Sequence, residues 1–235
     1  MTKNFVTLVA NSNFEEGDAN KALKILSAAQ LIDPENPRVQ ENIKNVREYF
    51  LKEMLDCLDD GGQKEVDEST TKFEFTYKSN QVEALIITGN LAKAEMLIND
   101  MTKLNPESNH LEYLNGMFHY MKGSLKVAIA ALEEVIKTDP LHHEAMTMLV
   151  KATKLDKFMN DSANLTKMND HNAVIQLLTK ALTIDSSNTI INRTMYFQRA
   201  MAHFSLDNPH AAYADYKMFE ESGIRIEDIL KIVKS

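Results

Sequence analysis

The sequence has few of the residues that cross-link or interrupt a chain. It contains a single cysteine, Cys57, among 235 residues, which excludes both an internal disulfide and a cysteine-based zinc site. Its 7 glycines and 5 prolines leave long stretches without a turn residue. An all-β sandwich or barrel would need a turn about every ten residues. The scarcity of chain breakers therefore excludes an all-β fold and favours helices.

Long apolar runs and an excess of positive charge are also missing. No run approaches the ~18 apolar residues that a membrane-spanning helix needs, and the apolar patch after Met1 is too short for the core of a signal peptide. The net charge of −8 argues against a nucleic-acid partner, because binding phosphates requires a positive field. We therefore expect a cytoplasmic chain, with the nucleus as a further location, and no membrane or nucleic-acid partner.

What the sequence does contain is an internal repeat. Three glycines are each followed 17 residues later by a proline, and the pairs are Gly17 and Pro34, Gly89 and Pro106, and Gly123 and Pro140. Chance would give about 0.15 such pairs. Alanine recurs five residues after each of these glycines, and large apolar residues recur after it. The last two pairs are offset by 34 residues, a period that is typical of tetratricopeptide repeats.

The stretch 109–142 resembles a tetratricopeptide repeat most clearly, with Gly116, Ala128, Leu132 and Pro140 at positions of that family's signature. The residue types suit two antiparallel helices. Gly123 can adopt a positive φ and end the first helix, while the small Ala128 lets the two helices approach closely. Leu132 and Val135 would fill the space between units, and Pro140 cannot continue the second helix. The resemblance implies an all-α, right-handed superhelical solenoid of helix-turn-helix repeats.

The pattern predicts a single solenoid over residues 1–235. We expect units at about 3–36, 37–74, 75–108, 109–142, 143–188 and 193–222, with a capping helix at 224–235. Unit 37–74 is degenerate: a helix over 39–58 is followed by a polar run at 63–72 that is either a short helix or a mobile loop. Unit 143–188 has a first helix lengthened by 12 residues to cover 143–168. Asn169 then stands where the turn glycine would be, since asparagine tolerates the left-handed conformation.

The order of these units, and the stretches 97–143, 174–185 and 196–219, resemble the repeat region of a J-domain co-chaperone. The resemblance implies a non-enzymatic protein-interaction scaffold, an adaptor for chaperones of the Hsp70 and Hsp90 types or for their client proteins. The His-Pro-Asp tripeptide on which J-domain activity depends does not occur in the chain. The alternative is a structural subunit of a larger multiprotein assembly, whose faces are permanently buried.

In the tail-binding clamp of such co-chaperones, lysine and asparagine side chains grip the carboxylates at the end of a peptide. The matching positions of unit 143–188 hold Met159 and Ala163, and the next helix offers Gln198. We therefore expect a degraded carboxylate clamp and weak or no binding of acidic chaperone tails through it.

The first helix of each unit would form the inner face of the solenoid, where we expect a peptide-binding groove. The candidate groove residues are Tyr113, Met117, Tyr120, Met121, Lys151, Lys154, Phe197 and Met201, with Thr147 and Phe204 beside them. Two interpretations stay open. The apolar side chains are either core between units or a groove in which flexible methionines accommodate varied partners. The two lysines are either solvated or pair with a partner's carboxylate.

No motif indicates catalysis, a cofactor or a metal. His143 and Glu144 begin a helix that lacks the second histidine of a zinc protease, because Thr147 occupies that place. Glycine-rich phosphate loops and a nucleophile elbow are missing, and Cys57 lies in an amphipathic helix without an evident base beside it. We expect no enzyme activity, no catalytic residues, no cofactor and no metal site.

Overall fold

The computed structural model describes residues 18–33, 35–56 and 63–220. This part of the chain is helical throughout and holds no strand, which confirms the all-α prediction. The chain divides into two compact units, Met1–Leu114 and Asn115–Ser235, which are taken in turn below. No helix in the described ranges is long and apolar enough to cross a membrane.

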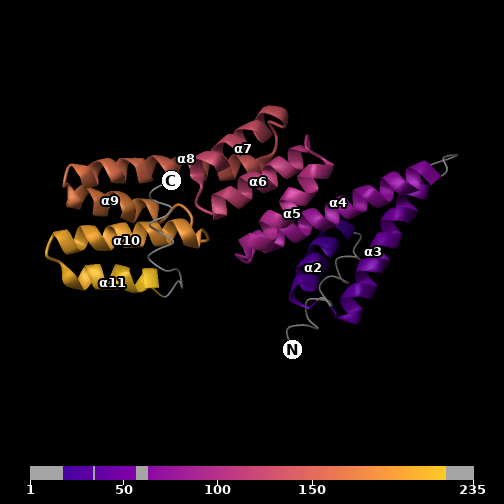
Figure 1. Cartoon of the computed structure of the whole chain (residues 1–235), viewed down its shortest axis with the longest axis horizontal. Coiled ribbons are helices and arrows are strands. Elements are labelled where there is room, and N and C mark those ends of the chain that lie inside the picture. The colour runs from indigo at the N-terminus through magenta and orange to yellow at the C-terminus, as the bar shows by residue number, and fades with distance from the viewer. Residues whose placement is uncertain (1–17, 34, 57–62, 221–235) are drawn as a thin grey trace. The chain divides into compact units, whose positions relative to one another are not determined.

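The first unit contains α2 (Ala19–Ile32), α3 (Pro37–Asp56), α4 (Gln63–Ile87), α5 (Leu91–Leu104) and the beginning of α6 (Asn109–Met121). Helix α2 packs against α3 and α4, and α4 also packs against α5 (Figure 1). Leu23 and Leu26 of α2, Val39 and Val46 of α3 and Phe73 of α4 meet in one buried apolar cluster. Asp18 caps the start of α2 by accepting a hydrogen bond from the Lys21 amide at 3.0 Å.

Helix α4 differs from the prediction for its region. The polar run 63–72 is neither a short helix nor a loop but the first part of a continuous helix of 25 residues. No glycine or proline stands between residues 63 and 88, so nothing in the sequence ends the helix before Gly89. The predicted first helix of unit 3–36, the break at 59–62 and the capping helix at 224–235 lie outside the described residues.

The second unit contains the rest of α6, then α7 (Leu125–Thr138), α8 (His143–Lys167), α9 (His171–Ala181), α10 (Thr189–Ser205) and α11 (Pro209–Glu220). From α7 onward each helix packs against the next along the chain, so that α8 to α11 lie side by side in Figure 1. The core joins α7 to α10 through buried residues that include Ala128, Leu155, Leu178 and Met195. The long helix predicted over 143–168 is confirmed by α8.

The 34-residue period is visible in the backbone and in the burial pattern. Gly89 and Gly123 both adopt a positive φ, 78° and 83°, immediately before α5 and α7. Ala94 and Ala128, five residues further on, are both fully buried. Asn169 has a φ of 57° before α9, which confirms that it replaces the turn glycine. The sequence pattern therefore predicted where each of these helix pairs turns.

Gly116 is required for a different reason, the close approach of two helices. A Cβ atom added to this residue of α6 would lie 2.9 Å from both Cγ and Cδ2 of Leu132 on α7. Leu132 is itself fully buried and has little room to move. The glycine of the repeat signature thus lets α7 pack directly onto the backbone of α6.

Candidate protein-interaction face

The predicted groove residues divide between the interior and the surface. Tyr120 is only 2% exposed and Met117 is also buried, so for these two the core interpretation holds. Met121 is half-buried and packs against the core of the second unit. Phe197 is half-buried and its ring centroid lies 5.4 Å from that of Phe219 on α11. These four side chains mainly hold helices together.

The other predicted residues lie nearer the surface. Met201 and Phe204 on α10 are 52% and 69% exposed, and Lys154 on α8 is exposed as well. Thr147 is exposed on the first half of α8. Tyr113, in the first unit, is half-buried with its ring centroid 6.2 Å from that of His110. Among the predicted groove residues, Met201 and Phe204 therefore form an exposed apolar pair on α10.

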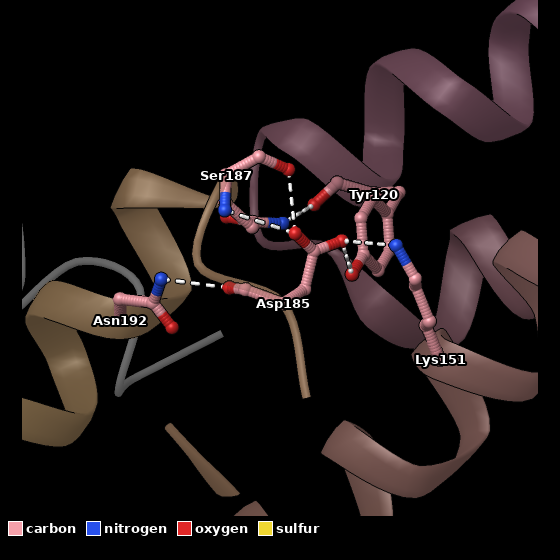
Figure 2. A network of polar contacts seen from close by, with 6 residues as sticks. Tyr120, Lys151, Asp185, Ser187 and Asn192 are labelled. Atoms are coloured by element: carbon pink, nitrogen blue, oxygen red, sulfur yellow. Dashed lines mark hydrogen bonds and ion pairs between the residues drawn. The ribbon is translucent and has the colours of Figure 1, made fainter. Parts of the chain in front are cut away.

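Lys151 pairs with Asp185 of the same unit, an arrangement that neither interpretation of the two lysines anticipated. Its Nζ donates to Asp185 Oδ2 at 3.1 Å, and the Tyr120 hydroxyl donates to the same oxygen at 2.8 Å (Figure 2). The carboxylate follows α9, the lysine comes from α8 and the tyrosine from α6. One nearly enclosed carboxylate thus ties three helices together.

The segment between α9 and α10 completes this network. The Ser187 amide and hydroxyl both donate to Asp185 Oδ1, and the Asn192 amide group donates to the Asp185 carbonyl at 2.8 Å (Figure 2). Asn188 caps α10 by accepting from the Ile191 amide, and its own amide group donates to the Tyr120 carbonyl at 2.7 Å. The buried polar groups of this segment therefore have partners, as a stable interior requires.

The network determines the charge states of its members. Burial alone would raise the pKa of Asp185, but the hydrogen bonds from Ser187, Tyr120 and Lys151 outweigh burial and lower the pKa to about 2. Burial, together with the neighbouring carboxylate, raises the pKa of Tyr120 well above its usual value of 10.0. Near neutral pH the aspartate is ionised and the tyrosine is a neutral donor.

The repeat spacing did not indicate this contact. Lys151 and Asp185 are 34 residues apart, but both fall in the predicted unit 143–188, whose first helix is lengthened, so they do not occupy equivalent places in adjacent repeats. Lys151 lies on the first helix of that pair and Asp185 follows the second. Sequence reasoning therefore missed the pair and the tyrosine that joins it.

A second ion pair fastens α10 to α11. The Arg199 guanidinium binds Asp215 with both arms, Nε to Oδ2 at 2.8 Å and Nη2 to Oδ1 at 2.6 Å, and its Nη1 donates to the Thr179 hydroxyl on α9. The Tyr196 ring lies 5.5 Å below the guanidinium carbon. The hydrogen bond to Asp215 raises the pKa of Arg199, so the guanidinium stays charged.

The three residues expected at clamp positions carry no positive charge. Met159 is half-buried against the core, Ala163 is exposed, and Gln198 is half-buried and accepts a long hydrogen bond of 3.5 Å from the Ser162 hydroxyl. Sequence reasoning missed Met146 and Val150, two exposed apolar side chains on the first half of α8. Their spacing of four residues places them on one helix face, which the sequence could have indicated.

The described residues contain no group of three His, Cys, Asp or Glu side chains that could hold a metal ion. His142 has a structural role, because its Nδ1 accepts a hydrogen bond from the Ala145 amide and caps α8. The prediction concerning Cys57 lies outside the described residues.

Comparison with known proteins gives sequence relatives and structural neighbours, although no family model matches the chain. The DnaJ homolog subfamily C member 7 homolog of Schizosaccharomyces pombe is 25% identical over 213 residues, which are 85% of this chain and 44% of the relative. DnaJ homolog subfamily C member 7 of Mus musculus is 23% identical over 207 residues, 85% of this chain and 42% of the relative. The chain spans less than half the length of these relatives.

Two solved structures are also similar to the chain. A tetratricopeptide repeat protein from Parabacteroides merdae aligns over 99% of this chain and 97% of its own, with 16% identity and a TM-score of 0.37. The P58(IPK) TPR domain aligns over 97% of this chain and 76% of its own, with 13% identity and a TM-score of 0.43. The sequence relatives confirm the resemblance to a J-domain co-chaperone: over most of its length, the chain is homologous to DnaJ homolog subfamily C member 7.

Proposed function

We propose that the chain is a non-enzymatic scaffold that binds proteins, an adaptor for chaperones of the Hsp70 and Hsp90 types or for their clients. Its homology to a DnaJ homolog supports the chaperone connection. The observation that carries the proposal is the exposure of Met201 and Phe204, two large apolar side chains three residues apart on the first helix of a pair. Exposed apolar side chains grouped on one helix face are typical of contact surfaces for other proteins.

The proposed partner surface binds apolar client segments rather than acidic chaperone tails. The positions that match a carboxylate clamp offer Met159, Ala163 and Gln198, none of which carries a positive charge. Lys151 is already paired with Asp185, so its charge is largely neutralised from within. The long thioether side chain of Met201 adapts to partners of varied shape, which suits a surface for unfolded clients.

A binding experiment with two ligands tests this proposal. Fluorescence anisotropy is measured with reduced, carboxymethylated α-lactalbumin as an unfolded client and with a peptide that ends in the acidic chaperone tail. We expect the client to bind and Phe204→Glu to weaken its binding about tenfold, because the change puts a charge into an apolar contact. We expect the acidic tail to bind no tighter than about 100 µM.

The control variant is Tyr213→Glu on α11, because Tyr213 and Phe204 are equally exposed at 69%. This variant should change client affinity less than about twofold. Equal losses of client affinity in Phe204→Glu and Tyr213→Glu would show that the surface of α10 has no special role. The prediction of a degraded clamp would be wrong if the acidic tail bound with micromolar affinity and a change of Lys151 or Lys154 abolished that binding.

A further inference from the structure

The first unit carries a cavity of about 740 Å³ that the proposed function does not use. It lies where the turn between α5 and α6 meets the side of α4, and its lining comes from residues 71–75 of α4 and residues 104–108 of that turn. Helix α4 has 25 residues and α5 has 14, so α4 continues past the end of α5 and leaves this recess uncovered by a paired helix. Its volume is within the range of about 300–1,000 Å³ that is usual for binding pockets.

The lining of this recess combines apolar walls with two opposite charges. Phe75, Leu104 and Pro106 supply the apolar surface, and Leu104 is 72% exposed although it is a large hydrophobic residue. Lys72 and Glu107 also line the recess. In the described part of the chain neither of these charges has an ion-pair or hydrogen-bond partner. The recess therefore offers apolar contact together with one unpaired ammonium and one unpaired carboxylate.

We propose that this recess binds a peptide segment in which one large apolar side chain lies between an acidic and a basic residue. The apolar side chain would fill the space against Phe75, Leu104 and Pro106. Its acidic neighbour would face Lys72 and its basic neighbour would face Glu107. Both of these charges are exposed, so they contribute mainly selectivity while apolar burial supplies the affinity.

This inference rests on the proposed function, because it assumes that the chain binds proteins, but it concerns a separate surface in a separate unit. The client assay depends on Phe204 in the second unit, whereas the recess is tested through residues of the first unit. Failure of one experiment therefore leaves the result of the other intact.

The test uses four capped tripeptides, Glu-Leu-Lys, Glu-Leu-Glu, Lys-Leu-Lys and Glu-Ala-Lys, titrated into the ¹⁵N-labelled full chain. The amide shifts of Leu104 and Glu107 report binding. We expect Glu-Leu-Lys to have the highest affinity, about threefold above that of Glu-Leu-Glu or Lys-Leu-Lys, the two peptides with like charges. Glu-Ala-Lys should give no saturable shift, because it lacks the apolar side chain. Equal affinity for all four peptides, or no shift at these residues, would overturn the proposal.

Two variants make the test specific. Leu104→Glu should abolish binding, while Met96→Glu should leave it unchanged, because Met96 is 67% exposed on the same helix but does not line the recess. Lys72→Glu should transfer the preference to Lys-Leu-Lys, since both charges in the recess are then negative. All three positions are exposed, and circular dichroism will show that the variants fold. Equal effects of Leu104→Glu and Met96→Glu, or an unchanged peptide preference in Lys72→Glu, would refute the assignment.

Discussion

Asp185 is the residue on which the polar interior of the second unit depends. Its carboxylate accepts hydrogen bonds from Tyr120, Lys151 and Ser187, and its pKa in the folded chain is about 2 against an ordinary value of 3.8. A pKa that folding lowers means that the ionised group stabilises the fold above pH 4. This stabilisation, about 2 kcal/mol, is lost progressively as the pH falls from 4 towards 2.

Acid unfolding followed by circular dichroism checks this prediction. We expect Asp185→Asn to lower the free energy of unfolding by about 2 kcal/mol at pH 7 and to flatten its pH dependence between pH 4 and 2. Asp207→Asn is a suitable control, because Asp207 is exposed. A wild-type protein and an Asp185→Asn variant with the same acid profile would contradict the role assigned to the carboxylate.

Gly116 gives a second prediction for a single residue. In an open helix, replacing glycine by alanine adds about 1 kcal/mol of stability. At Gly116 the new methyl group would lie 2.9 Å from Leu132, so we expect Gly116→Ala to destabilise the chain by about 1–3 kcal/mol in chemical denaturation. In a Leu132→Ala background the same substitution should cost little, since the clashing atoms are gone. An additive double mutant would show that the clash is not the cause.

At the level of helices, Ala128 sets the distance between paired elements. It is fully buried on α7, whereas Ala130, two residues further along the same helix, is exposed. We expect Ala128→Leu to overpack the interface and cost about 1–3 kcal/mol, while Ala130→Leu changes stability by less than about 0.5 kcal/mol. Thermal melting of the two variants compares them directly, and an unchanged melting temperature for Ala128→Leu would defeat this explanation.

Helices and their turns could be predicted where one residue type determines the backbone. Gly123 and Asn169 indicated the positive φ that starts α7 and α9, and the unbroken stretch after His143 indicated the length of α8. The continuous helix α4 was missed because its polar first half gives a weak apolar pattern. The absence of any breaker before Gly89 was the better guide.

The candidate face could be predicted only in part, because burial depends on helices distant in sequence. Met117 and Met201 look alike in the sequence pattern, yet one is buried and the other is half exposed. Lys151 and Lys154 are one turn apart, and only Lys151 meets a carboxylate, which comes from the segment after α9. Periodicity identifies which face of a helix a residue occupies, but not which neighbour covers it.

For the molecule as a whole, the adaptor hypothesis and the alternative of a permanent subunit predict different behaviour in solution. A permanent subunit needs a contiguous apolar surface larger than several hundred Å² and aggregates when it is alone. We expect the isolated chain to sediment as a monomer in analytical ultracentrifugation at about 50 µM. At about this concentration, the exposed apolar surface of a permanent subunit would self-associate. Concentration-dependent aggregation would favour the subunit.

Repeat arrays are usually treated as modular, since each repeat contacts only its neighbours and can be removed or duplicated. In the second unit this dependence on the neighbour is polar as well as apolar. Tyr120 lies in the predicted unit 109–142, and its partners Asp185 and Asn188 lie in the predicted unit 143–188. Excising everything after Ala181 would leave the buried Tyr120 hydroxyl without its acceptor and the Lys151 ammonium group without its carboxylate. A truncated fragment that keeps these groups partnered therefore has to extend past α9 to Asn188.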